Sequence, residues 1–203
     1  MQTCGLSLTI DPRWIVAVPE NADVSAEVAQ QLGEPPTNFE AERWTALTGD
    51  VAVMLSRALD AGAWWSGIFL AQENDGEYLL ARAVIEHEQL EDAADLDRIY
   101  EELIAIHRED DYQAVISIIE MRLGRAVGHR QVIDLDKETV GEYRGYHIPV
   151  ESGIVRVQAF SSGVGWAEVW GPSLESMVLT LRWSDEVPAG QVGMQMYVLA
   201  EAL

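Results

Sequence analysis

The sequence predicts a single α+β domain, mainly an antiparallel β-sheet with helices packed on it. Two strand-like runs flank the turn signal Asp75-Gly76, and four more follow one another across short turns between residues 114 and 160. Amphipathic helical spacing appears in four other segments, 24–32, 38–62, 96–109 and 173–181. A hairpin and a meander are antiparallel arrangements, so these patterns together indicate the class.

The N-terminal third is expected to contain a strand and two helices. Residues 6–18 form the strand, interrupted by the turn signal Asp11-Pro12 and ended by Pro19. A short amphipathic stretch, 24–32, is cut off by Gly33 and a Pro-Pro pair. The longer helix begins at Thr37 or Asn38 as its cap, and Gly62 ends it. Its apolar face carries Trp44, Leu47, Val51, Met54, Leu55 and Leu59.

The middle of the chain predicts a hairpin followed by an acidic helix. Residues 64–72 and 77–88 are the two strands, and the glycine of Asp75-Gly76 suits the tight turn between them. The helix that follows has an apolar face from Leu96 to His107 and ends near Glu109. Acidic residues stand near its N-terminal end, where they suit the helix dipole.

The C-terminal half is typical of a meander closed by one helix. Strands are predicted at 114–123, 126–135, 141–150 and 153–160. Ser173 is expected to cap a last helix that carries Leu174, Met177, Val178 and Leu181. Residues 191–199 add a final strand. No long Ser/Gly/Pro-rich linker divides the chain, so residues 1–203 are interpreted as one domain.

The charge of the chain restricts its partners. It carries 34 Asp and Glu against 13 Lys and Arg, a net charge of -21. The resulting negative potential repels phosphate backbones and anionic membrane surfaces, so nucleic acid is not expected as a partner. Solubility in the cytoplasm is the ordinary explanation of such acidity. The more specific alternative is that the charge attracts a basic protein partner.

The sequence also bears on location. One cysteine, Cys4, allows no internal disulfide, and the residues before it supply neither the charged nor the apolar region of an export signal. No apolar run approaches the 18 residues of a membrane span. We therefore expect a cytoplasmic protein without membrane insertion.

The order of elements resembles the PsbP-like group, which includes small actinobacterial proteins of unknown role and LpqN-type lipoproteins. The resemblance lies mainly in residues 114–183, in the segments Leu123-Gly124-Arg125-Ala126-Val127, Tyr146-His147-Ile148-Pro149-Val150 and Val157-Gln158-Ala159-Phe160-Ser161-Ser162. It implies an antiparallel sheet covered by helices, in proteins that mostly bind other proteins. The chain departs from the LpqN-type pattern in lacking a usable lipobox.

No motif for catalysis, metal or cofactor binding is present. The chain has no nucleophile elbow, no phosphate-binding glycine loop and no pair of histidines at zinc-ligand spacing, so we expect no catalytic, metal or cofactor residues. His129 and His147, on strands that neighbour each other in a meander, stand near Tyr143 and Tyr146. A histidine beside such groups is able to act as a general acid or base, which keeps an enzyme as the third hypothesis.

A protein-interaction surface is the first hypothesis for function. Between Glu86 and Asp111 there are 11 acidic residues and two basic ones, and seven tryptophans offer aromatic anchors. The expected partner surface consists of Trp64, Trp65, Trp166, Trp170, Asp92, Asp95, Asp97, Glu101 and Glu102. A module for a small apolar ligand, held between sheet and helix, is the second hypothesis. A large enclosed apolar cavity would favour it, whereas a cleft joining His129 or His147 to a carboxylate would favour an enzyme.

Overall fold

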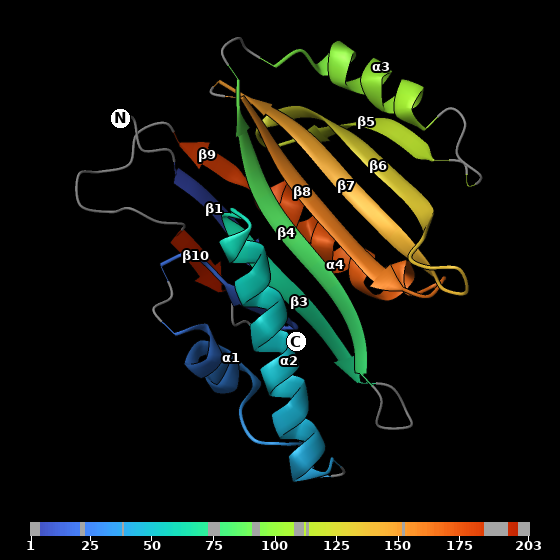
Figure 1. The fold of residues 1–203 in the computed structure, drawn as a ribbon. Coiled ribbons are helices and arrows are strands. Elements are labelled where there is room, and N and C mark those ends of the chain that lie inside the picture. Colours follow the sequence, from blue (N-terminus) through green and yellow to red (C-terminus); the bar gives the residue numbers. More distant parts are fainter. Residues whose placement is uncertain are drawn as a thin grey trace.

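The seven-stranded antiparallel sheet confirms the predicted α+β class. The computed structural model describes residues 5–20, 23–37, 39–72, 78–90, 94–107, 112, 114–151, 153–184 and 195–198. Helices cover both faces of this sheet, and a small three-stranded sheet lies beside it (Figure 1). Within these residues no helix is both long and apolar enough to cross a membrane.

The large sheet joins the predicted hairpin to the predicted meander. Its strands lie in the order β2-β3-β4-β8-β7-β6-β5. The hairpin β3–β4 and the meander β5–β8 are confirmed, and β8 pairs with β4, as in Ala83 opposite Ala159. The hairpin turn at Asp75-Gly76 lies outside the described residues. The strands are β2 (Trp14–Ala17), β3 (Trp65–Gln72), β4 (Tyr78–Gln89), β5 (Val115–Met121), β6 (Gly124–Asp134), β7 (Val140–Val150) and β8 (Gly153–Ser162).

The predicted strand 6–18 divides between the two sheets. The turn after Asp11 separates β1 (Gly5–Ile10) from β2, and a backbone hydrogen bond from Trp14 N–H to the Asp11 carbonyl closes it at 3.0 Å. Strand β1 is the centre of the small sheet, between β9 (Arg182–Ser184) and β10 (Gln195–Val198). Strand β10 runs parallel to β1 and lies within the predicted last strand, whereas β9 was not predicted.

The described part of the chain contains four helices, α1 (Val24–Leu32), α2 (Ala41–Asp60), α3 (Leu96–Ile106) and α4 (Ala167–Thr180). Helix α2 begins after Glu40, later than predicted from Thr37 or Asn38, and Asn38 lies outside the described residues. The predicted start of α4 at Ser173 is wrong. Ser173 is buried inside a helix that begins at Ala167. Its hydroxyl bonds to side chains across the core and does not cap the helix.

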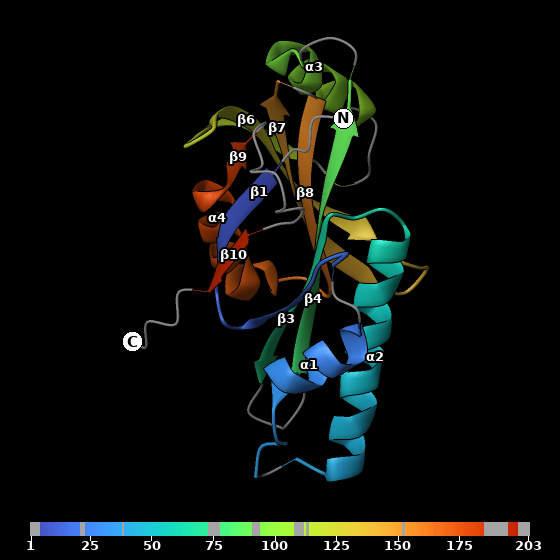
Figure 2. The same ribbon diagram turned by 90° about the vertical axis from the view of Figure 1, so that its left-hand side faces the viewer.

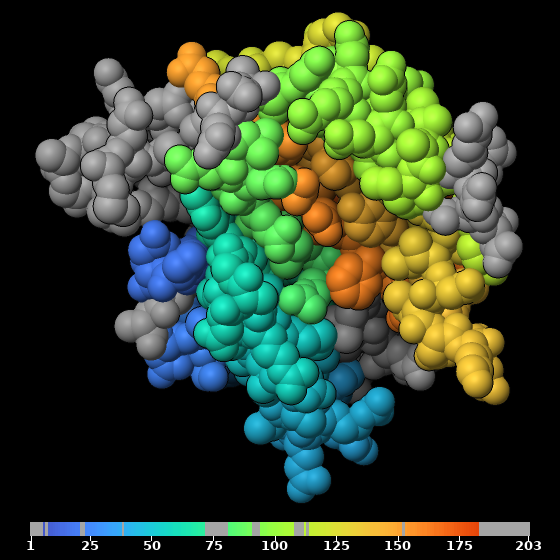
Figure 3. All heavy atoms as spheres, turned by 45° about the horizontal axis from the view of Figure 1, so that its top comes forward, coloured from blue at the N-terminus to red at the C-terminus, as the bar shows by residue number. Residues whose placement is uncertain are grey.

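Alternation along the strands builds a core on each face of the large sheet. Figure 2 shows α4 and the small sheet on one face and α2 and α3 on the other. The α4 face holds the larger cluster, with Trp65, Phe69 and Leu174 fully buried. On the opposite face, α2 covers a cluster around Ile68 and α3 covers one around Val127. Side chains of β4, β8 and β7 come to the surface between these two helices (Figure 3).

Candidate functional site

The structure corrects the predicted tryptophan surface. Trp65 and Trp170 are fully buried, so neither is able to anchor a partner at the surface. Trp65 lies on the α4 face of the sheet, 6.1 Å from Trp14 between ring centroids. Trp170 points inward from α4 and donates a hydrogen bond from its indole to the Ser161 hydroxyl at 2.9 Å. Trp64 and Trp166 are half-buried: the Trp64 ring lies 4.9 Å from that of His87, and Trp166 packs against the edge of the α4-face core.

Four of the predicted acidic residues lie on α3 or at its N-cap. Asp97, Glu101 and Glu102 are exposed on the helix, and exposed Asp95 caps it by accepting the Asp97 N–H at 3.0 Å. Arg98 pairs with Glu102 at 3.1 Å. It is the one basic residue of α3, whereas three residues of the helix are acidic, so the helix keeps a net negative charge. Asp92 lies outside the described residues. Helix α3 packs on β5 and β6, which places its acidic outer surface over one end of the sheet.

One edge of the large sheet is closed by a side chain. Gln31 of α1 donates from Nε2 to the Val16 carbonyl at 2.8 Å and accepts the Val16 N–H at 2.9 Å. A side-chain amide therefore supplies both bonds that an added strand would make at this residue. All four residues of β2 are also buried, so this edge offers no free strand to a partner.

The other edge, β5, lacks this protection. Strand β5 pairs only with β6, and among the described residues no side chain is hydrogen-bonded to its backbone. Val115 and Ile118 are 47% and 37% exposed. The seven residues of β5 carry one charge, Glu120, and none of the lysines or prolines that commonly block an exposed edge. We define this strand as the β5 edge; the sequence predicted the strand but not its place at the border of the sheet.

The two candidate histidines, His129 and His147, lie on the face of the sheet that α3 covers. His147 stands opposite Val127 on β6, and His129 is two residues further along that strand. The rings of His129 and His107 are 4.3 Å apart between centroids, and His129 is 5.1 Å from Tyr143. Burial lowers the pKa of His147 to about 4, with Arg156 and then His129 adding to the effect. Burial likewise raises the pKa of Tyr143 to about 12. Both groups are therefore neutral near pH 7, where a catalytic base with so low a pKa is weak.

Among the cavities that the described residues line, two that adjoin the sheet have charged linings. One of about 320 Å³ lies between β5, β6, β7 and α4 and is lined by Arg130, Arg144 and Glu175 among others. His129 also lines it, although the His129 ring contacts His107 on the opposite face. The second, of about 180 Å³, lies beside the C-terminal end of α2 and includes Arg82 and Glu86. Neither is an enclosed apolar cavity of the kind that the ligand hypothesis requires.

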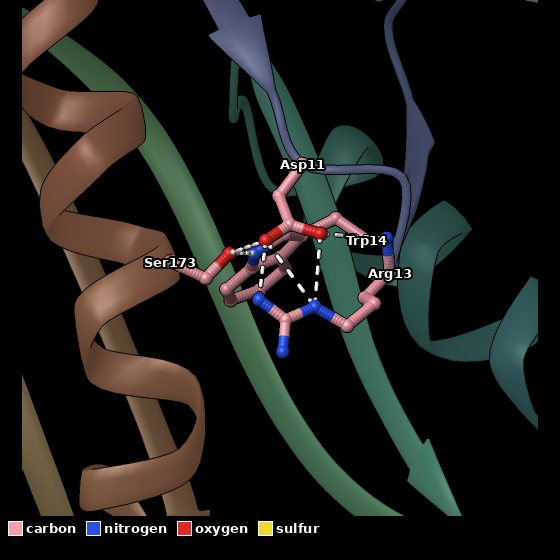
Figure 4. Close-up of polar contacts among 4 residues, drawn as sticks. All are labelled: Asp11, Arg13, Trp14 and Ser173. Atoms are coloured by element: carbon pink, nitrogen blue, oxygen red, sulfur yellow. Dashed lines mark hydrogen bonds and ion pairs between the residues drawn. The ribbon is translucent and has the colours of Figure 1, made fainter. Parts of the chain in front are cut away.

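A polar network that reaches from the core to the surface holds α4 to the turn between β1 and β2. The Trp14 indole donates to the Ser173 hydroxyl at 2.8 Å, and that hydroxyl donates to the Asp11 carboxylate at 2.8 Å (Figure 4). Arg13 pairs with the same carboxylate and stacks over the Phe69 ring. Hydrogen bonding to Arg13 is the main cause that lowers the pKa of Asp11 to about 2. The Trp14 indole and the Ser173 hydroxyl, the two donors that come from the core, each have an acceptor, which is the arrangement of a structural anchor.

Among the described residues, no three His, Cys, Asp or Glu side chains are grouped to hold a metal ion. No protein-family model matches this chain, and no curated protein matches it.

Proposed function

We propose that this chain is a non-enzymatic interaction protein whose partner adds an extended, basic segment to the β5 edge. The observation that carries the proposal is the difference between the two borders of one sheet. Gln31 occupies the hydrogen-bonding groups of Val16 on β2, whereas β5 has no such cover within the described chain. An extended peptide binds to such an edge through main-chain hydrogen bonds.

The side chains of β5 supply the apolar contact. Seven residues at about 3.3 Å each make an edge of about 23 Å, which is long enough for several backbone hydrogen bonds. Val115 and Ile118 are exposed there, and they take the anchoring role that the sequence had suggested for Trp65 and Trp170. Apolar contacts of this kind slow dissociation, because separating the partners returns apolar surface to water.

Charge selects the class of partner. The acidic outer surface of α3 lies over β5 and β6, and the whole chain has a net charge of -21. Pairing of two copies through β5 would bring these charges together, whereas a Lys- or Arg-rich segment is attracted. The resemblance to the PsbP-like group, whose members mostly bind other proteins, supports the same proposal. A cytoplasmic location is part of it.

A synthetic strand tests this function directly. The probe is a fluorescent peptide of about ten residues in which Lys and Val alternate, and binding is followed by anisotropy. We expect saturable binding, and the association rate should fall as salt rises from about 0.05 to 0.5 M. Salt screens the long-range attraction between the basic peptide and the acidic protein more than it weakens the short-range contacts of the complex. The control peptide has the same sequence with N-methylation on alternate residues, which keeps the charge but prevents strand pairing.

Two matched variants localise the binding. Ile118→Lys puts a charge on the β5 edge, and Val53→Lys puts the same charge at an exposed apolar position on α2. Ile118→Lys should weaken binding by about tenfold or more, and Val53→Lys by much less. Equal losses in the two variants, or equal binding of the N-methylated peptide, would show general charge attraction and refute addition at β5.

A further inference from the structure

The cavity between β5, β6, β7 and α4 concentrates positive charge in an acidic protein. Arg130 on β6 and Arg144 on β7 both line it and stand directly opposite each other in the strand register. Like charges in this arrangement destabilise a sheet. The chain has only 13 Lys and Arg in all, so two of them placed across one cavity indicate a site for an anion.

The surroundings hold Arg144 in place. Its Nη2 donates to the Ala167 carbonyl of α4 at 3.1 Å, and its guanidinium lies 5.5 Å from the Trp170 ring centroid. A β-carbon at Gly171 would collide with this guanidinium, so the glycine permits its close approach to α4. Arg144 is therefore oriented before any ligand arrives, which lowers the entropic cost of binding.

Arg130 supplies the second, uncommitted guanidinium. It is exposed at the cavity and makes no hydrogen bond or ion pair with any described residue. A planar carboxylate accepts two parallel hydrogen bonds from a guanidinium, and a pair of arginines is able to hold it from two sides. The Ser117 hydroxyl lines the same cavity and adds another polar group.

The remaining lining restricts the ligand. Val115, Ile119 and Tyr146 give the cavity apolar surface, and Glu175 places a carboxylate in its lining. Glu175 disfavours a ligand with two negative charges, such as a phosphate. A volume of about 320 Å³ suits a small molecule. We propose that Arg130 and Arg144 bind a small monocarboxylate whose apolar body contacts β5, a function that goes beyond partner binding at the β5 edge and shares Val115 with it.

Nuclear magnetic resonance of the whole chain tests this site with benzoate as the probe. We expect benzoate to shift the Nε–Hε signals of Arg130 and Arg144 in a saturable manner. The main variant is Arg130→Gln, because the Arg130 side chain is exposed and its loss leaves the core intact. It should weaken benzoate binding by about tenfold or more, which corresponds to about 1.4 kcal/mol. The control, Arg57→Gln, removes an exposed arginine from α2 and should leave the affinity for benzoate unchanged.

Inorganic phosphate distinguishes the ligand class. Wild-type protein should bind phosphate more weakly than benzoate, and Glu175→Gln should raise phosphate affinity more than benzoate affinity, because phosphate carries the larger negative charge. Benzoate shifts that never saturate, or that persist unchanged in Arg130→Gln, would overturn the site. Tighter binding of phosphate than of benzoate by the wild type would overturn the monocarboxylate assignment.

Discussion

The indole of Trp14 donates a hydrogen bond to the hydroxyl of Ser173, which lies 159 positions later in the chain. This bond connects strand β2 with helix α4 through the interior, and the Ser173 hydroxyl in turn donates a hydrogen bond to the Asp11 carboxylate. The helix is thereby fixed against the same strands that begin the large sheet. Its position in turn determines where Arg144 meets Ala167 at the charged cavity.

Ser173→Ala should destabilise the fold by about 1–3 kcal/mol, because it leaves the buried Trp14 indole N–H without an acceptor. Urea denaturation followed by tryptophan fluorescence measures the loss. Ser176→Ala provides the control, since Ser176 is exposed on the same helix and its substitution should alter stability by less than about 0.5 kcal/mol. Equal midpoints for the two variants would contradict an anchoring role for Ser173.

Gln31→Glu should reopen the edge at β2. The carboxylate has nearly the shape of the amide but is unable to donate to the Val16 carbonyl, and it repels that oxygen. We expect a loss of about 1–3 kcal/mol in the free energy of unfolding, together with slow association seen by light scattering. Gln30→Glu adds the same charge at an exposed neighbouring position. A similar loss in that control would mean that charge alone, and not edge closure, is responsible.

Stability should fall in weak acid through His147. Its folded pKa is about 4 and its ordinary value 6.5, so the unfolded chain binds an extra proton between these pH values. The contribution of neutral His147 is therefore complete above pH 6.5 and is lost as the pH falls toward 4. His147→Gln should reduce the decline between pH 7 and 4.5 by about 1–2 kcal/mol, measured by denaturation at several pH values. If His147→Gln lost as much stability between pH 7 and 4.5 as the wild type, protonation of His147 would not be the cause of the loss.

Two glycines should respond to alanine in opposite directions. Gly153, in the turn from β7 to β8, has φ +142° and a β-carbon there would collide with the Glu88 carbonyl oxygen. Gly153→Ala should cost about 1–3 kcal/mol. Gly49 lies in α2 with open space around it, so Gly49→Ala should stabilise by about 0.5–1 kcal/mol. Thermal unfolding of both variants measures the two changes in stability. If both variants were stabilised, or both destabilised, the explanation from backbone conformation would be wrong.

Local patterns in the sequence determined most of the elements. The amphipathic stretch 24–32 became α1 with the same bounds, and the hairpin and the four strands of the meander all appear. These predictions succeed because apolar periodicity and turn residues act within a few positions of one another. Adjacent residues on a strand point to opposite faces, so Trp64 and Trp65 differ in burial although the sequence placed both on one partner surface.

The tertiary structure alone decided which residues meet across the chain. No local pattern indicates that β8 pairs with β4, that Gln31 closes β2 or that β5 is left at the border. The same holds for Ser173, which resembles a helix cap in sequence but serves Trp14 in the core. Periodicity reports which side of one element is apolar, whereas the identity of its neighbours depends on the packing of distant segments. The open edge and the two-arginine cavity arise from that packing, so the sequence showed their residues without showing the sites.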